Sequence, residues 1–290
     1  MSVARPVTEF RADLGESPLW STVESALYWI DIAGRRLHRL ADGDPEPRSW
    51  DLPAKPGCLA SRASGGLIVA LATGVHAFDP ETGVLTLLVN PEPDQPGNRL
   101  NDGAADLAGR LWVGSMDDAE KSPDAGSLYR IDPDGTCTTM LTGLGISNGI
   151  GWSPDGATMY HTDTTTRTIS AYDFDAATGT ISAGRTFATD EDCYPDGLTV
   201  DADGYVWSAK WDGWRIVRYA PDGAIDRVLP MPVQRPSCVA FGGPDLDRLY
   251  ITSARVHLSE HALAASPLAG TVLVLDGTGV TGQAEPPCQL

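Results

Sequence analysis

The sequence has few cysteines, few basic residues and no long apolar run, and each scarcity excludes a class of protein. Five cysteines are scattered over 290 residues, and none forms a CxxC pair, which argues against a disulfide framework or a thiolate zinc site. Lysine and arginine number 21 against 39 acids, a net charge of -18. Because such a field repels phosphate backbones and anionic membranes, we expect neither as a partner.

The chain also has no stretch of about 18 apolar residues and no apolar N-terminal run like a signal peptide. We therefore expect a cytoplasmic protein without a membrane span. Glycine (31) and proline (22) are abundant instead, which favours many tight turns between short strands. All-β proteins of this length commonly form one domain, so we predict a single domain over residues 1–290.

One pattern recurs six times: an apolar or aromatic strand, a break, and a second strand that ends near aspartate and glycine. Successive copies begin 40, 43, 48, 47 and 44 residues apart, at Ala26, Gly66, Gly109, Ala157, Gly204 and Arg248. A period near this length is typical of a propeller blade. We predict an all-β, six-bladed β-propeller with four-stranded antiparallel blades around a central channel. The segment from Pro6 to Phe10 should pair within the last blade, which would otherwise leave an open edge.

A polar residue beside glycine marks the segment before the aromatic strand in several copies. The phrases are Gly15-Glu16-Ser17-Pro18, Asn101-Asp102-Gly103, Ser147-Asn148-Gly149 and Pro195-Asp196-Gly197. We predict that these segments are the innermost strands, which would bring Glu16, Asn148 and Asp196 together on the axis. Two carboxylates and an amide oxygen suit a hard divalent cation, which would neutralise the like charges. The alternative is that Asp-Gly and Asn-Gly pairs are ordinary turn residues.

Five phrases in order along the chain carry a family resemblance: LGESPLW, NRLND, ISNGIGWSPDG, YPDGLTVDADGYVW and FGGPDLDRLYITSAR. In them the sequence resembles the gluconolactonase, regucalcin and senescence-marker family, with a likeness to bacterial sugar lactonases such as xylonolactonase. The resemblance implies one divalent cation held by Glu16, Asn148 and Asp196. It also implies that Arg99 and Asn101 bind substrate. Asp102 is a further polar contact or a second, weak cation ligand.

The function that the resemblance implies is that of a metal-dependent carboxylic-ester hydrolase. It would open a sugar lactone to the aldonic acid in bacterial sugar catabolism. Asp196 would take a proton from the attacking water, and the cation would act as Lewis acid. Oxygen-rich ligation permits calcium, zinc, manganese, magnesium or ferrous iron. A small sugar lactone is therefore the expected partner, and a monomer is the expected state.

Two other functions stay open. A serine hydrolase is disfavoured because no GxSxG elbow is present and Ser147 has no evident histidine partner. Of the five histidines, His161 is the one expected near the channel. A non-catalytic calcium-binding or protein-interaction propeller would hold the same ion for structure alone.

Two further segments have no assigned role. Trp211 and Trp214 could stack on a sugar, although interblade packing is favoured. Some relatives carry a glutamate in the loop after the third aromatic strand that contacts substrate. Asp117, Asp118 and Glu120 offer no unambiguous counterpart here, so the sequence leaves substrate choice open.

Overall fold

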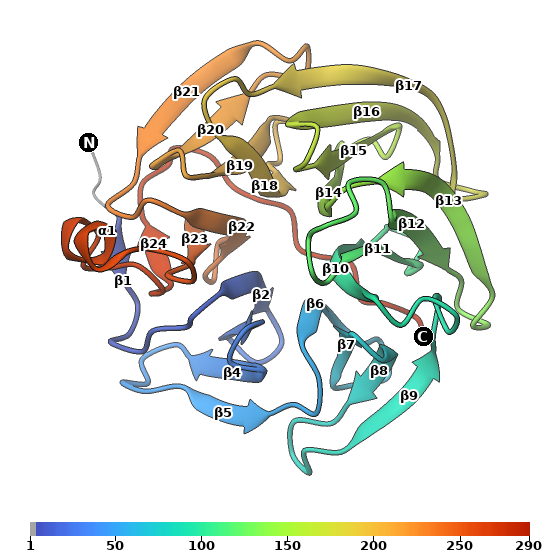
Figure 1. Cartoon of the computed structure of the whole chain (residues 1–290), viewed down its shortest axis with the longest axis horizontal. Helices are drawn as coiled ribbons and strands as arrows, with labels where there is room; N and C mark the ends of the chain where they lie inside the picture. Colours follow the sequence, from blue (N-terminus) through green and yellow to red (C-terminus); the bar gives the residue numbers. More distant parts are fainter. Residues whose placement is uncertain (1–3) are drawn as a thin grey trace.

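The computed structural model describes residues 4–290 and consists of six four-stranded antiparallel sheets arranged around a central axis (Figure 1). In blades 1 to 5 the strands run outward from the axis in chain order, and in blade 6 the N-terminal strand β1 is the outermost. Blade 1 contains β2 (Gly15–Ser21), β3 (Ala26–Asp31), β4 (Arg36–Ala41) and β5 (Arg48–Asp51). Blade 2 contains β6 (Pro56–Ser61), β7 (Leu67–Leu71), β8 (Gly74–Phe78) and β9 (Leu85–Val89). Blade 3 contains β10 (Asn98–Ala105), β11 (Leu111–Asp117), β12 (Gly126–Ile131) and β13 (Cys137–Leu144).

The other three blades follow the same order around the ring. Blade 4 contains β14 (Ser147–Trp152), β15 (Thr158–Asp163), β16 (Thr168–Asp175) and β17 (Thr180–Thr189). Blade 5 contains β18 (Tyr194–Val200), β19 (Val206–Trp211), β20 (Arg215–Tyr219) and β21 (Ile225–Pro230). Blade 6 contains β22 (Pro236–Gly242), β23 (Arg248–Ser253), β24 (Leu273–Leu275) and β1 (Arg5–Pro6). The predicted six-bladed propeller is therefore confirmed, and each of the six sequence repeats begins at the second strand of a blade.

The last blade is completed by the start of the described chain. Arg5 pairs with Val274 and Pro6 with Leu273, and Val7 donates its N–H to the Val272 carbonyl at 3.0 Å. The predicted pairing of the N-terminal segment is thus confirmed, although the strand begins one residue earlier and does not reach Phe10. A short helix, α1 (Glu260–Ala265), lies between β23 and β24; six residues are too few to give a helical period in the sequence.

Tryptophans of the second strands fill the space between blades. Trp112 and Trp207 are fully buried, and each indole N–H donates to a buried aspartate, Asp106 at 3.0 Å and Asp201 at 2.8 Å. An arginine on the same blade pairs with each of these aspartates. A buried carboxylate must be compensated, and in blades 3 and 5 the arginine and the indole N–H supply that compensation.

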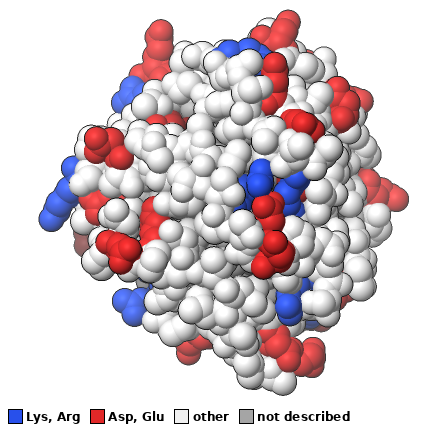
Figure 2. All heavy atoms as spheres, turned by 90° about the vertical axis from the view of Figure 1, so that its right-hand side faces the viewer, with Lys and Arg blue, Asp and Glu red and all other residues white. Residues whose placement is uncertain are grey.

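The surface carries scattered charges of both signs. Figure 2 shows acidic side chains spread over the visible side, with lysines and arginines in small groups among them rather than in a continuous basic stripe. No helix among residues 4–290 is long and apolar enough to cross a membrane. All five cysteines are free, as the scattered spacing predicts.

A buried histidine in blade 1 makes stability depend on pH. His38 is fully buried, its ring lies 4.3 Å from that of Phe10, and desolvation lowers its pKa to about 4. The unfolded chain binds this proton below pH 6.5, whereas the folded chain does not until about pH 4. The contribution of neutral His38 is therefore present above pH 6.5 and is lost as the pH falls through this window.

When the pH is lowered from 7.5 to 5, the free energy of unfolding should fall by about 2 kcal/mol more in the wild type than in His38→Gln. Urea unfolding at both pH values measures the difference. The exposed His261 provides the control, because His261→Gln should follow the wild type. Equal losses in wild type and His38→Gln would contradict the assignment.

Candidate metal centre and active site

All six innermost strands are irregular at the same point. Their pairing with the second strand shifts register at Glu16/Leu19, Pro56/Cys58, Leu100/Gly103, Asn148/Ile150, Pro195/Leu198 and Pro236/Val239. A β-bulge re-aims a side chain out of the normal alternation. The polar residues predicted on the axis sit at or beside these bulges. The Asp-Gly and Asn-Gly pairs at Asp102, Asn148 and Asp196 therefore lie within strands, and the interpretation as ordinary turns is wrong for them.

The three predicted metal ligands are brought together and are nearly buried. Glu16, Asn148 and Asp196 have exposed fractions of 7%, 6% and 5%. Asn148 Nδ2 donates to Asp196 Oδ1 and lies 3.2 Å from Thr164 Oγ1. Glu16 accepts the N–H of Ser17 at 3.0 Å, and Asn148 Oδ1 accepts that of Gly149 at 3.2 Å. Each side chain is thus folded over its own bulge toward the axis.

Three carboxylates are buried close to one another at this site, those of Glu16, Asp102 and Asp196, and their charges repel. Burial, followed by the charges of Asp196 and Asp102, raises the pKa of Glu16 well above its usual value. Burial and the charge of Asp102 likewise raise the pKa of Asp196. Asp102, 8% exposed, has a pKa raised to about 6 by burial. Arg99 is the cation whose charge lowers the pKa of both Glu16 and Asp196. One guanidinium therefore acts on two of the three buried acids, so another positive charge would stabilise their ionised forms.

Glycine permits this convergence at Asn148. A Cβ on Gly149 would stand 2.7 Å from the Asp196 carbonyl oxygen and from the Leu198 nitrogen. Strands β14 and β18 can approach this closely only because residue 149 has no side chain. The glycine after the ligand is thus required by strand packing, and it brings the Asn148 and Asp196 side chains within contact.

The donor set fits one hard divalent cation. No three His, Cys, Asp or Glu side chains within residues 4–290 group closely enough to ligate an ion without other donors. An ion beside Glu16 and Asp196 therefore needs the Asn148 amide oxygen or water as well. Asn148 Nδ2 now faces Asp196, and a rotation of the amide group by half a turn would place Oδ1 there instead. Carboxylate, amide oxygen and water are the ligands that calcium and magnesium prefer.

Arg99 and Asn101, the predicted substrate-binding residues, lie together at the channel mouth, the end at which the innermost strands begin. Arg99 is 7% exposed, and its Nη1 donates to Asn101 Oδ1 at 2.6 Å and to the Leu100 carbonyl at 3.2 Å. Asn101 Nδ2 donates to the Ser147 carbonyl at 2.9 Å. Asn101 therefore holds Arg99 and ties blade 3 to blade 4, with one lone pair and one N–H left for a ligand.

Sequence reasoning missed one partner of Arg99, Asp118, and a second cation that the same carboxylate binds. Asp118 Oδ1 forms an ion pair with Arg99 Nε at 3.1 Å and accepts from Lys55 Nζ at 2.7 Å. Lys55 belongs to the connection before blade 2, so no sequence motif links it to Asp118.

Trp211 packs against the Arg235 guanidinium, 4.8 Å from its ring, while Trp214 is 37% exposed.

The expectation that Ser147 has no histidine partner is wrong. Ser147 Oγ lies 2.8 Å from His161 Nε2. The two side chains are 0% and 2% exposed, and burial lowers the pKa of His161 to about 4. A neutral histidine could accept a proton, but a nucleophile must reach its substrate. This pair is closed off from solvent, and it cannot attack a bound ester without movement of the strands.

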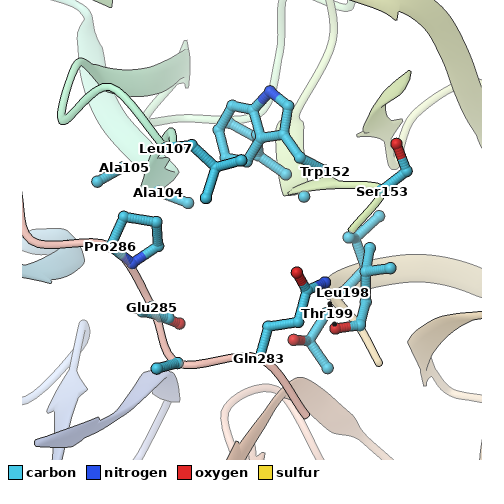
Figure 3. Close-up of a pocket in the computed structure, with 14 residues that line it drawn as sticks. Ala104, Ala105, Leu107, Trp152, Ser153, Leu198, Thr199, Gln283, Glu285 and Pro286 are labelled. Carbon is cyan, nitrogen blue, oxygen red and sulfur yellow. Dashed lines mark hydrogen bonds between the residues drawn. The ribbon is translucent and has the colours of Figure 1, made fainter. Parts of the chain in front are cut away.

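The opposite end of the channel holds a separate hollow (Figure 3). It is lined by the far ends of β10, β14 and β18, including Trp152 and Leu198, and by residues 283–286 of the C-terminal segment. None of the predicted site residues lines it. Glu285 is exposed within this hollow, yet surrounding protein and the charge of Asp102 raise its pKa to about 7. It adds another acid along the axis, from a segment outside the repeats.

Comparisons with known proteins give the family and the fold that this chain resembles. Residues 14–255 match the model of the SMP-30/Gluconolactonase/LRE-like region. The chain is 39% identical to a 6-deoxy-6-sulfogluconolactonase of Pseudomonas putida over 94% of each chain. It is 41% identical to an L-arabinolactonase of Azospirillum brasilense over 92% of this chain and 90% of that one. Among solved structures, a calcium-binding regucalcin of Agrobacterium tumefaciens superposes with a TM-score of 0.95 at 34% identity, covering 100% of this chain and 98% of the other.

Binding of a divalent cation should stabilise the protein through the axial carboxylates. We expect calcium or manganese, added to chelated protein at about 100 times its dissociation constant, to raise the melting temperature by roughly 5 °C. Glu16→Gln and Asp196→Asn should abolish that gain. Without the ion they should be no less stable than the wild type, because each removes a buried acid from a crowded set. Differential scanning calorimetry measures both effects.

Asp226→Asn provides the matched control, since Asp226 is an aspartate of blade 5 far from the axis, paired with Arg218 at 2.8 Å. It should retain the full gain. A normal gain in Asp196→Asn would show that the ion binds elsewhere.

Proposed function

The chain belongs to the SMP-30/gluconolactonase/LRE-like family, and on that premise we propose that it hydrolyses a sugar lactone to the aldonate with one divalent cation held by Glu16, Asn148 and Asp196. The observation that carries the proposal is the convergence of buried, under-compensated acids beside a buried arginine that retains a free donor. Two relatives of about 40% identity are named as sugar lactonases, which favours this substrate class. We further propose that residues 1–290 act as one domain.

The cation, when bound, supplies Lewis-acid stabilisation of the negative charge that develops on the lactone oxygen. Calcium, magnesium, manganese, zinc and ferrous iron all remain compatible with the donor set. Of these, calcium is the ion named for the regucalcin relative. Glu16 and Asn148 would hold the ion, because Glu16 keeps a carboxylate oxygen outside its contact with Ser17 and the Asn148 amide lies against Asp196.

Asp196 would act as the general base. Its Oδ1 accepts from Asn148 Nδ2, so Oδ2 is the oxygen that no side chain engages among residues 4–290. Oδ2 is thus the atom that can accept a proton from the attacking water. Once a cation compensates the axial acids, Asp196 stays ionised at neutral pH, which a base requires. Asp102 stands near enough for its charge to raise the pKa of Asp196, and it would repel the aldonate product.

Arg99 would orient the sugar. Its Nε and Nη1 are occupied by Asp118, Asn101 and the Leu100 carbonyl, which leaves Nη2 to donate to a lactone or hydroxyl oxygen. A guanidinium held in one plane loses little freedom on binding and so places the ester carbon reproducibly. Asn101 and Asp102 provide further polar contacts at the same mouth.

A non-catalytic calcium-binding propeller is the second candidate, favoured by the name of the regucalcin relative. Both functions need the same ion. They differ in whether a lactone is consumed.

Proton release distinguishes the two candidates. Xylono-, arabino-, galactono- and gluconolactone are added to chelated protein, then again after each cation is restored, and the rate of a protein-free blank is subtracted. We expect metal-restored turnover that falls by at least about 100-fold in Asp196→Asn, the size of effect expected for a lost general base.

Asp226→Asn should turn over at the wild-type rate. Cation binding without turnover of any lactone would reject the lactonase and favour the binding propeller. Equal turnover in Asp196→Asn and wild type would remove Asp196 from the reaction.

A further inference from the structure

A chain of ion pairs joins blade 2 to blade 3 at the channel mouth. Asp118 Oδ1 lies 2.7 Å from Lys55 Nζ and 3.1 Å from Arg99 Nε. Asp118 Oδ2 also accepts from Lys55 Nζ, at 2.9 Å. Arg99 is 7% exposed, while Lys55 and Asp118 are 35% and 40% exposed. One carboxylate therefore compensates a buried and a half-exposed cation at the point where a substrate would enter.

The loop that carries Asp118 is held by its own hydrogen bonds. Asp117 Oδ2 accepts the N–H groups of Lys121 at 2.8 Å and Ser122 at 3.0 Å. The N–H of Asp118 donates to the Gly97 carbonyl at 3.0 Å, next to the first residue of β10. Asp117 thus shapes the loop, and the Gly97 contact brings Asp118 beside the strand that carries Arg99. Backbone hydrogen bonds of the loop therefore hold Asp118 next to Arg99.

Arg99 depends on these contacts for its orientation. Two of its three nitrogens are occupied, Nε by Asp118 and Nη1 by Asn101 and the Leu100 carbonyl. Without Asp118 the guanidinium would keep only the Nη1 contacts and could rotate about them. A bidentate arrangement fixes the plane of a guanidinium, and a single contact does not.

We propose that Asp118 is a positioning residue that orients Arg99, and that by compensating Arg99 and Lys55 it makes the channel mouth select sugar lactones without an anionic substituent. The inference rests on the proposed lactone hydrolysis. Two neighbouring cations would attract a sulfonate or a phosphate. Asp118 cancels one of the two charges, and the charge of Glu120 also acts on Arg99, so the mouth has no excess positive charge to offer.

Overall identity does not settle this choice. The chain is 39% identical to a relative named for a sulfonated gluconolactone and 41% identical to one named for L-arabinolactone, which carries no anionic group. Local charge at the mouth must therefore decide between an anionic and a neutral lactone.

The test uses two substrates that differ by one anionic group, glucono-δ-lactone and its 6-phosphate. Asp118→Ala and Asp118→Asn should lower kcat/KM for the neutral lactone about tenfold, the effect of one lost charge-assisted hydrogen bond. The ratio of kcat/KM for the phosphorylated over the neutral lactone should rise by at least about tenfold as Lys55 and Arg99 lose their shared anion. Asp118→Glu, which retains the charge, should restore the preference for the neutral lactone.

Asp226→Asn is the matched control, because Asp226 is 30% exposed and pairs with an arginine, Arg218, that is 4% exposed. It removes the same kind of ion pair from the outermost strand of blade 5 and should change neither the rate nor the ratio. Equal melting temperatures of the Asp118 variants and the wild type show that folding is intact. If Asp118→Ala does not fold, Asp118→Asn and Asp118→Glu carry the test.

A ratio that stays within about twofold of the wild type in Asp118→Asn would overturn the inference while leaving the lactonase intact. If the wild type hydrolyses no lactone, the proposed function itself fails. Calorimetric binding of gluconolactam and its 6-phosphate then tests the mouth directly, since the ring amide resists hydrolysis. Asp118→Asn should bind the phosphorylated lactam more tightly than the wild type does, and equal binding would reject the role of Asp118.

Discussion

The mutual repulsion of buried carboxylates on the propeller axis is the constraint on which the rest of the site depends. Glu16, Asp102 and Asp196 are each less than a tenth exposed. Burial raises the pKa of all three, and neighbouring carboxylates raise those of Glu16 and Asp196 further. A fold that only needed a packed axis would place apolar side chains there, since unpaired buried charge costs several kcal/mol per ion. A bound cation would stabilise the ionised form of these acids, so the proposed metal binding and the proposed role of Asp196 as a base depend on the same electrostatics.

One repeated feature of the propeller, a β-bulge in each innermost strand, brings these side chains together. Every innermost strand is bulged at the same level, and residues far apart in the chain thereby point at a common axis. Side-chain identity then differs from blade to blade. Blades 1, 3, 4 and 5 present acids or an amide there, whereas blades 2 and 6 present the thiols of Cys58 and Cys238, whose pKa the axial acids help to raise. The proposed ion site thus depends on four of the six equivalent positions.

Much of this could be predicted from the sequence, because a repeat places equivalent residues in equivalent positions. The six aromatic strands, the innermost position of Glu16, Asn148 and Asp196, and the closure of blade 6 by the N-terminal segment all followed from the period. Side-chain contacts that do not follow from the repeat period could not be predicted. Ser147 and His161 meet across β14 and β15 in a register that the sequence does not state. Asp118 meets Lys55 only because blades 2 and 3 are neighbours, and Glu285 reaches the axis from a segment that belongs to no repeat.

The mouth and the axis divide the work by charge. At the channel mouth, the positive side chains are paired with carboxylates, and one nitrogen of Arg99 remains free to donate. On the axis, acids outnumber cations, so a bound cation would stabilise them. Diffraction from crystals grown with manganese, recorded at a wavelength where the metal scatters anomalously, tests this division most directly. The account predicts one strong anomalous peak about 2.0 to 2.6 Å from oxygens of Glu16, Asn148 and Asp196, with the Asn148 amide turned to present Oδ1. A map with no peak on the axis, and with Asn148 still donating to Asp196, would contradict it.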